Sequence, residues 1–93
     1  MHKVVINSCY GCFWLSSIAQ EWLREHYNIS DFEKLSRHDL RLIECVETLG
    51  DYANGFPSKL TVVEIEDNMY RIEDYDGYEH LVTPSKEKYI VID

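Results

Sequence analysis

The opening of the chain constrains the fold most, because a short apolar run leads through a glycine-centred loop into a helical pattern. The run at residues 4–6 predicts a buried strand that ends at Asn7. Gly11 lies at the centre of the loop, and Ser16 or Ser17 is expected to cap the helix. A loop of this kind presents free N–H groups and the positive end of a helix dipole to a ligand. It is therefore the first candidate for a binding site.

Two helical patterns follow this loop before any further strand is predicted. Residues 16–27 and 37–49 repeat apolar side chains at helical spacing, with polar and charged residues between them. We expect Asn28 to end the first helix in a left-handed conformation. Ser36 is expected to cap the second helix and Gly50 to end it.

The strands are gathered at the end of the chain. Asp67 and Asn68 are expected to form a hairpin turn between the first two of them. Apolar runs predict strands at residues 59–66 and 69–74, a continuation of the sheet at 80–83 and a last strand at 89–92. The element order β-α-α-β-β-β predicts one α+β domain over residues 1–93, with two helices on one face of a small mixed sheet.

The charge of the chain is strongly and unevenly acidic. Its 93 residues carry a formal net charge of −8, and residues 64–79 hold seven acids against one base, Arg71. A phosphate backbone is bound by clustered Lys and Arg, which are missing here, so we expect no direct nucleic-acid binding. A solvated acidic sheet face explains the run, and an acidic surface that imitates a phosphate backbone stays open.

No segment of the sequence suits a membrane or a secretory signal. The longest apolar runs have three or four residues, which is too short for a membrane span. Residues 1–3 lead directly into the first predicted strand without a signal-peptide core, so a cytoplasmic location is expected.

Cys9 and Cys12 form a C-x-x-C pair between a strand and a helix, the placement found in thioredoxin-like oxidoreductases. A helix N-terminus would favour the thiolate of Cys9. The alternative is two cysteines packed as small apolar residues, which the missing strand after the first helix favours. Cys45 lies on an apolar helical stripe and is expected in the core. No second close pair of Cys or His exists for zinc, so we expect no metal and no cofactor.

The turn at residues 75–80 is the second candidate for binding, because it combines flat rings with hydrogen-bond acceptors. Its rings can stack on a base, and its carboxylates can accept hydrogen bonds from one. The alternative is a hairpin turn with cross-strand aromatic contacts. The residues concerned are Tyr75, Asp76, Gly77, Tyr78, Glu79 and His80.

Three motifs, in a fixed order, cover nearly the whole chain. They read V-I-N-x-C-Y-G-x-F-x-L-S at 5–16, V-E-x-L-G-x-x-A-N-G at 46–55 with L-x-V-V-E-I at 60–65, and E-x-Y-D-G-x-E-H at 73–80. In them the chain resembles a family of small proteins from bacteriophages and some large viruses that has no settled activity. The resemblance implies a viral accessory protein in the cytoplasm of an infected cell. That family usually has glycine in place of Cys12, which weakens the redox hypothesis.

We therefore expect a non-catalytic protein that binds a nucleotide-like or other small anionic ligand and so counters a host defence. The ligand would lie between the opening loop and the turn at 75–80. Backbone N–H groups near Gly11 would hold its anionic part, and the acidic surroundings limit it to one or two charges. The expected contacts in the loop are Asn7, Cys9, Tyr10, Gly11, Phe13, Ser16 and Ser17.

Two alternatives from other classes stay open. One is an acidic protein that inhibits a host enzyme through its strand face, and the other is a thiol oxidoreductase that uses Cys9 and Cys12. A homodimer that closes the ligand site is also left open.

Overall fold

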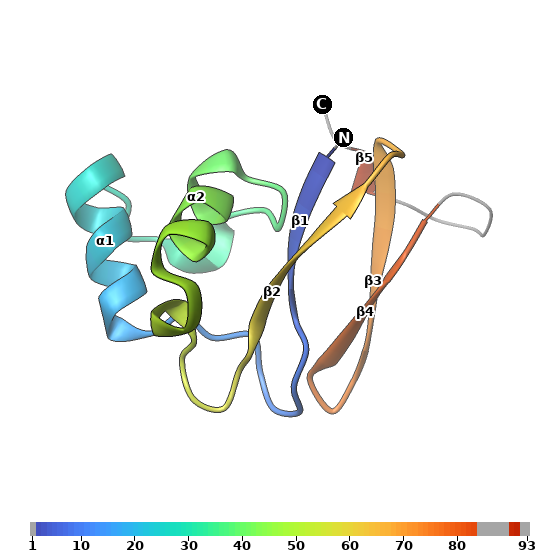
Figure 1. Cartoon of the computed structure of the whole chain (residues 1–93), viewed down its shortest axis with the longest axis horizontal. Helices are drawn as coiled ribbons and strands as arrows, with labels where there is room; N and C mark the ends of the chain where they lie inside the picture. The colour runs from blue at the N-terminus through green and yellow to red at the C-terminus, as the bar shows by residue number, and fades with distance from the viewer. Residues whose placement is uncertain (1, 84–89, 92–93) are drawn as a thin grey trace.

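The computed structural model describes residues 2–83 and 90–91, and Figure 1 shows the arrangement of the chain. The α+β class and the predicted element order are confirmed, and β5 lies within the last predicted strand at residues 89–92. The outer residues of that predicted strand lie outside the described part. In chain order the elements are β1 (His2–Asn7), α1 (Ser17–Tyr27), η1 (Phe32–Lys34), α2 (Leu40–Leu49), η2 (Gly50–Ala53), β2 (Leu60–Ile65), β3 (Met69–Tyr75), β4 (Tyr78–Val82) and β5 (Ile90–Val91), where η marks a 3-10 helix.

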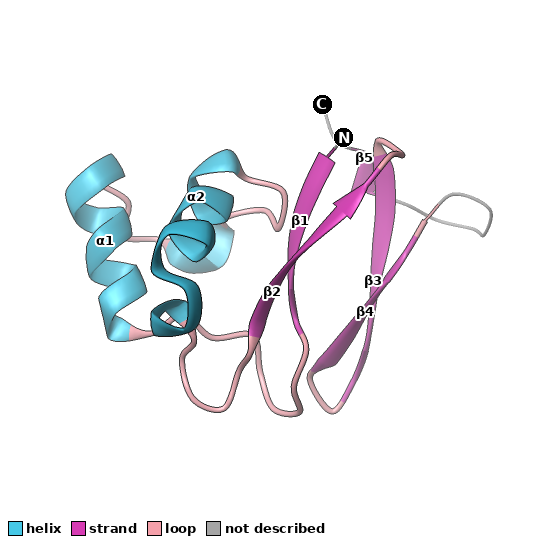
Figure 2. Ribbon diagram, in the orientation of Figure 1, coloured by secondary structure: helices cyan, strands magenta, loops and turns pink. Residues whose placement is uncertain are grey.

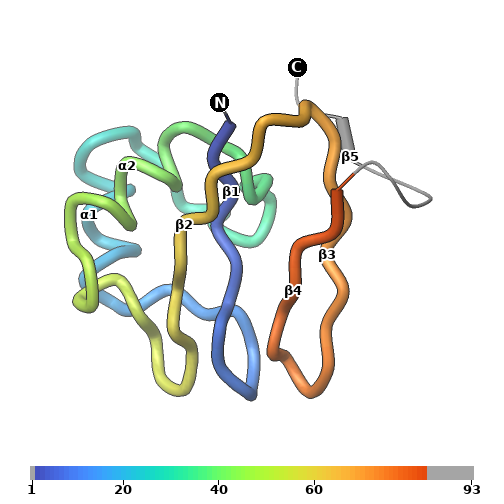
Figure 3. Tube along the Cα trace, turned by 45° about the vertical axis from the view of Figure 1, so that its right-hand side comes forward, coloured from blue at the N-terminus to red at the C-terminus, as the bar shows by residue number. Residues whose placement is uncertain are grey.

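The strands form two antiparallel sheets instead of the single mixed sheet that the sequence predicted. One sheet pairs β1 with β2, and the other has the order β4-β3-β5 (Figure 3). Asp67 and Asn68 therefore join strands of different sheets, and the expected hairpin between β2 and β3 does not form. The reason is apolar packing. Ile65 of β2 and Tyr70 of β3 belong to one core cluster, so β3 crosses over the face of the first sheet.

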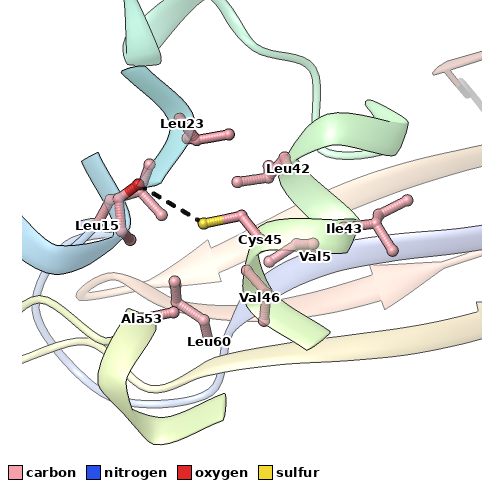
Figure 4. Close-up of a cluster of buried hydrophobic side chains, with 10 residues drawn as sticks. Val5, Leu15, Leu23, Leu42, Ile43, Cys45, Val46, Ala53 and Leu60 are labelled. Carbon is pink, nitrogen blue, oxygen red and sulfur yellow. Dashed lines mark hydrogen bonds between the residues drawn. The ribbon is translucent and has the colours of Figure 1, made fainter. Parts of the chain in front are cut away.

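The first core lies between the helices and one face of the β1–β2 sheet (Figure 2). Val5 and Leu60 face the helices, because side chains alternate between the two faces of a strand. Cys45 is fully buried there, as predicted, with its Sγ 3.7 Å from the carbonyl oxygen of Ala19 (Figure 4). Burial raises the pKa of this thiol to about 11.

The second core lies between the two sheets. Val4 and Ile6 point away from the helices and pack with Ile65 and Tyr70, which is 1% exposed. The β1–β2 sheet is thus covered on both faces, which explains the unbroken apolar run at residues 4–6 of β1.

The helix boundaries correct two predictions. Ser16 caps α1 as one of the two expected candidates, since its hydroxyl accepts the Ala19 N–H at 3.0 Å, and Asn28 ends the helix with a φ of 55°. However, α2 begins at Leu40 instead of residue 37, and Asp39 replaces Ser36 as its cap. The residues before it are held on β1, because the carbonyl of Arg37 accepts the Val5 N–H at 2.8 Å. Past Gly50 the chain continues as η2, where a loop was expected.

Candidate functional site

The two predicted halves of the binding site meet at one end of the molecule. The loop after β1 and the turn between β3 and β4 lie side by side at the lower end of Figure 1. The Gly11 N–H donates to the carbonyl of Asp76 at 2.7 Å, and the Asn7 side-chain amide donates to that of Gly77 at 2.8 Å. Asp76 and Gly77 both have positive φ, as a type I′ hairpin turn requires.

Glycine allows this contact because the two backbones touch. A Cβ atom built on Gly77 would overlap the carbonyl of Gly11. One built on Gly11, whose φ is 106°, would in turn overlap the ring of Pro57. Three segments that lie far apart in sequence are therefore packed closely together, and the first two leave no room between them for a ligand.

Glu79 is the buried centre of this junction, with only 7% of its surface exposed. Its Oε1 accepts the Asn7 backbone N–H at 2.8 Å and a guanidinium N–H of Arg37 at 2.5 Å. The other guanidinium nitrogen donates to Oε2 at 2.9 Å, so the ion pair is bidentate. Both Glu79 oxygens thus accept hydrogen bonds from within the protein, and the expected contact of Glu79 with a ligand stays a prediction.

Arg37 forms hydrogen bonds with the edge of β1 that faces away from β2. Its carbonyl accepts the Val5 N–H at 2.8 Å, and its guanidinium donates to the Val5 carbonyl at 3.4 Å. One residue thus replaces the hydrogen bonds that a neighbouring strand would make. The guanidinium also lies 3.7 Å from the ring centre of Phe13, a cation–π contact.

The donors that were expected to hold an anion are occupied in the same way. The Gly11 N–H is bonded to Asp76, and the Ser16 hydroxyl both caps α1 and donates to the Tyr52 carbonyl at 2.5 Å. The Gly11 N–H and the Ser16 hydroxyl thus both donate to backbone carbonyls of the protein, and the expected anion site stays a prediction. Ser17 remains exposed at the start of α1.

The predicted rings form a row on the outside of the junction. The ring centres of Tyr10 and Tyr78 are 5.3 Å apart, and those of Tyr78 and His80 are 5.1 Å apart in a stacked arrangement. Tyr75 pairs with Tyr78 across the hairpin and is 70% exposed. The turn is a hairpin, as the alternative predicted, but the ring contacts of Tyr78 run along β4 to His80 and to Tyr10 of the opening loop.

A pocket of about 360 Å³ opens beside the junction, on the helix side of the opening loop. Its volume falls within the range of small-molecule sites. Phe13 is the one predicted site residue that it contains. It is lined by Phe13, Trp14, Leu15, Gln20, Phe32, Glu33, Leu35 and Arg37.

A wider groove of about 1010 Å³ runs along α2 and the start of β1. Its cations are paired with neighbouring carboxylates, Lys3 with Glu47 at 2.7 Å and Arg41 with Asp39 at 2.8 Å. Arg41 also holds the pKa of Asp39 below its usual range, mainly through their hydrogen bond. Because the charges compensate each other, this groove offers a ligand little net attraction.

The cysteines do not reproduce an activated thiol pair. Cys9 is half-buried and Cys12 exposed, and all three cysteines are free. Cys9 and Cys12 lie before Ser16, the cap of α1, and so outside the first turn where the helix dipole acts. Among residues 2–83 and 90–91, no three His, Cys, Asp or Glu side chains gather in a group that could hold a metal ion.

Sequence reasoning missed Arg37 and Phe32. Arg37 was assigned to the surface of a helix, and its partner Glu79 lies 42 positions away, so no local pattern marks the pair. Phe32 lies in the 3-10 helix η1, and a single aromatic residue between two helices gives only a weak local signal.

Comparisons with known proteins leave the geometry as the basis for assigning a function. No family model matches the chain, and no curated protein or solved structure is significantly similar to it. Within the described part, no helix has the length and apolar character needed to cross a membrane.

Proposed function

We propose that the protein is a non-catalytic binding protein for a small, flat, nucleotide-like molecule, held in the 360 Å³ pocket beside the opening loop. The observation that supports this most is the lining, which includes three aromatic residues, Phe13, Trp14 and Phe32. Stacking on aromatic side chains is worth about 1–3 kcal/mol for a nucleobase.

The polar groups of the pocket define the kind of ligand. Glu33 is an exposed carboxylate that can accept hydrogen bonds from the amino group of a heterocycle. Arg37 adds a guanidinium, but Glu79 already compensates its charge. Together with the net charge of −8, this favours a ligand with one or two anionic groups over a polyphosphate.

The resemblance to viral proteins supplies the setting of the proposal. In that setting the protein would act in the host cytoplasm and withdraw a host metabolite or signal from use, which would counter a host defence. Capture of this kind requires affinity and no chemical step.

Calorimetric titration with free nucleobases, mononucleotides, cyclic dinucleotides and ADP-ribose derivatives tests the proposal. We expect heat and a thermal shift with at least one of them. Phe32→Leu should weaken that ligand at least about fivefold, since it removes a stacking partner worth ~1 kcal/mol or more. Glu33→Gln should also weaken it, whereas Glu21→Gln, an exposed carboxylate of α1 outside the pocket, should not. No heat with any compound, or unchanged binding in Phe32→Leu, would refute the pocket.

A further inference from the structure

Large apolar side chains are unusually exposed at the end of the molecule where the loops meet. A soluble protein rarely leaves a contiguous apolar patch of several such residues open to solvent unless a partner covers it. Most of them project from the loop after β1, from η2 and the segment after it, and from the β3–β4 turn, which all lie at the lower end of Figure 1. The exposed fractions are 60% for Tyr10, 53% for Trp14, 72% for Tyr52, 95% for Phe56 and 70% for Tyr75.

Contacts among these segments hold the five exposed residues at the same end of the molecule, here called the aromatic end and defined by those five residues. Tyr10 and Tyr75 both adjoin Tyr78, by ring contact and by strand pairing respectively. Two further contacts involve glycines. Gly11 lies against Pro57, the neighbour of Phe56, and Gly55 lies against the ring of Trp14. The Ser16 hydroxyl connects the same loop to the carbonyl of Tyr52.

Phe56 is the most exposed of the five and lies in a turn that is fixed by hydrogen bonds of Gly55 and Ser58. The Ser58 N–H donates to the Gly55 carbonyl at 2.6 Å, and the Gly55 N–H donates to the Trp14 carbonyl at 2.9 Å. The Ser58 hydroxyl lies within hydrogen-bond distance of both carbonyls, at 2.7 Å from Trp14 and 2.5 Å from Gly55. An apolar ring on a turn fixed in this way loses little conformational freedom when a partner covers it, which favours binding.

The area fits a protein interface. At about 200 Å² for each ring, the exposed fractions of the five side chains amount to roughly 700 Å². One partner contributes ~800 Å² to an interface of standard size. Aromatic residues are also the ones that dominate binding energy at such interfaces.

The charges around the aromatic end indicate the kind of partner. Asp51 adjoins Tyr52, and Asp74 and Asp76 flank Tyr75; all three carboxylates belong to exposed residues. Lys59, three positions after Phe56, is the nearest base to that ring in sequence. A second copy of the chain would bring the same carboxylates face to face, which like-charge repulsion disfavours.

We infer that the aromatic end docks on a basic segment of another protein, one in which apolar side chains alternate with Lys or Arg. The apolar side chains would pack around Phe56 and Tyr75, and the cations would face Asp76 and Asp51. Trp14 belongs both to this surface and to the small-molecule pocket, but Phe56, Tyr75 and Tyr52 do not line the pocket, so they test the inference separately.

An array of random dodecapeptides, probed with the labelled full-length chain, tests the inference. We expect the bound peptides to be enriched in Lys and Arg together with Leu, Ile, Phe or Trp, and their affinity to fall as salt is raised. For the best peptide, fluorescence anisotropy should show at least a tenfold loss of affinity with Phe56→Ser. Asp76→Asn should reduce the affinity for this peptide more at low salt than at high salt.

Leu40→Ser is the matched control, because Leu40 is 80% exposed at the start of α2, at the opposite end of that helix from η2. It should leave peptide affinity unchanged. Phe56→Ser should melt like the parent protein, since the ring is almost fully exposed. Four results would overturn the inference: no bound peptide, a preference for neutral or acidic peptides, unchanged affinity in Phe56→Ser, or self-association in sedimentation that Phe56→Ser abolishes. Because Phe56 lies outside the pocket, its variants leave the calorimetric test of the small ligand unaffected.

Discussion

Removing the guanidinium of Arg37 should destabilise the protein far more than neutralising the carboxylate that it pairs with. In Arg37→Met, Glu79 keeps its charge inside the junction, where its side chain is 8% exposed. Leaving a buried charge without its partner costs about 3–5 kcal/mol. A domain of this length has a total stability of about 5–14 kcal/mol, so this variant approaches the limit of folding.

Glu79→Gln should cost less, about 1–3 kcal/mol. The glutamine carbonyl can still accept the Asn7 N–H, and the Arg37 side chain, 25% exposed, retains access to water. Arg37→Met therefore leaves a buried carboxylate unpaired, whereas Glu79→Gln leaves a guanidinium that water can still reach.

Urea unfolding at pH 7, followed by circular dichroism, measures both values. The double variant Arg37→Met/Glu79→Gln should be more stable than the sum of the two losses predicts, because it leaves no unpaired charge. Equal losses for the two single variants would contradict this asymmetry, and losses below about 1 kcal/mol for both would show that the junction does not depend on this ion pair.

Three further predictions concern other parts of the structure. Gly77→Ala should cost about 1–3 kcal/mol more than Gly50→Ala in the same assay, because both glycines have positive φ but only a Cβ on Gly77 meets another backbone; equal costs would contradict the contact. At pH 8 a disulfide reagent should label Cys12 in the folded protein and Cys45 only on unfolding, since burial raises the pKa of Cys45 to about 11; simultaneous labelling of all thiols would refute the packing. Asp39→Ala should cost about 1 kcal/mol as a lost helix cap. Because Arg41 lowers the pKa of Asp39 in the folded state, its contribution should be present above the ordinary aspartate pKa and be lost as the pH falls through the lowered one, and this dependence should vanish in Asp39→Asn.

The sequence was sufficient for features that depend on neighbouring residues. Ser16 and Asn28 delimit α1 as the capping rules predict, and Asp76-Gly77 forms the expected turn. The predicted start of α2 was wrong because it is determined by a contact that is distant in sequence. The Arg37 carbonyl accepts a hydrogen bond from β1, so the helix begins only after Asp39.

The candidate site was likewise predicted only in part. The sequence identified Gly11 and the turn at 75–80 as special, and the structure brings them into contact. It did not reveal that Gly11 and Glu79 satisfy groups within the protein, because hydrogen-bond partners 42 to 72 positions apart leave no local pattern. Phe56 was not singled out either, since a phenylalanine inside an N-G-F-P-S turn gives no sign of its exposure without the fold.

The braced loops also give the molecule the properties of an engineering scaffold. Glycine contacts and backbone hydrogen bonds hold three loops at one end, and the outward side chains of Tyr10, Phe56 and Tyr75 take little part in holding them. Those positions can therefore be randomised while the frame around Gly11 and Gly77 is kept. A library built in this way would display three variable segments on fixed backbones, the arrangement that antibody loops use to acquire new specificities.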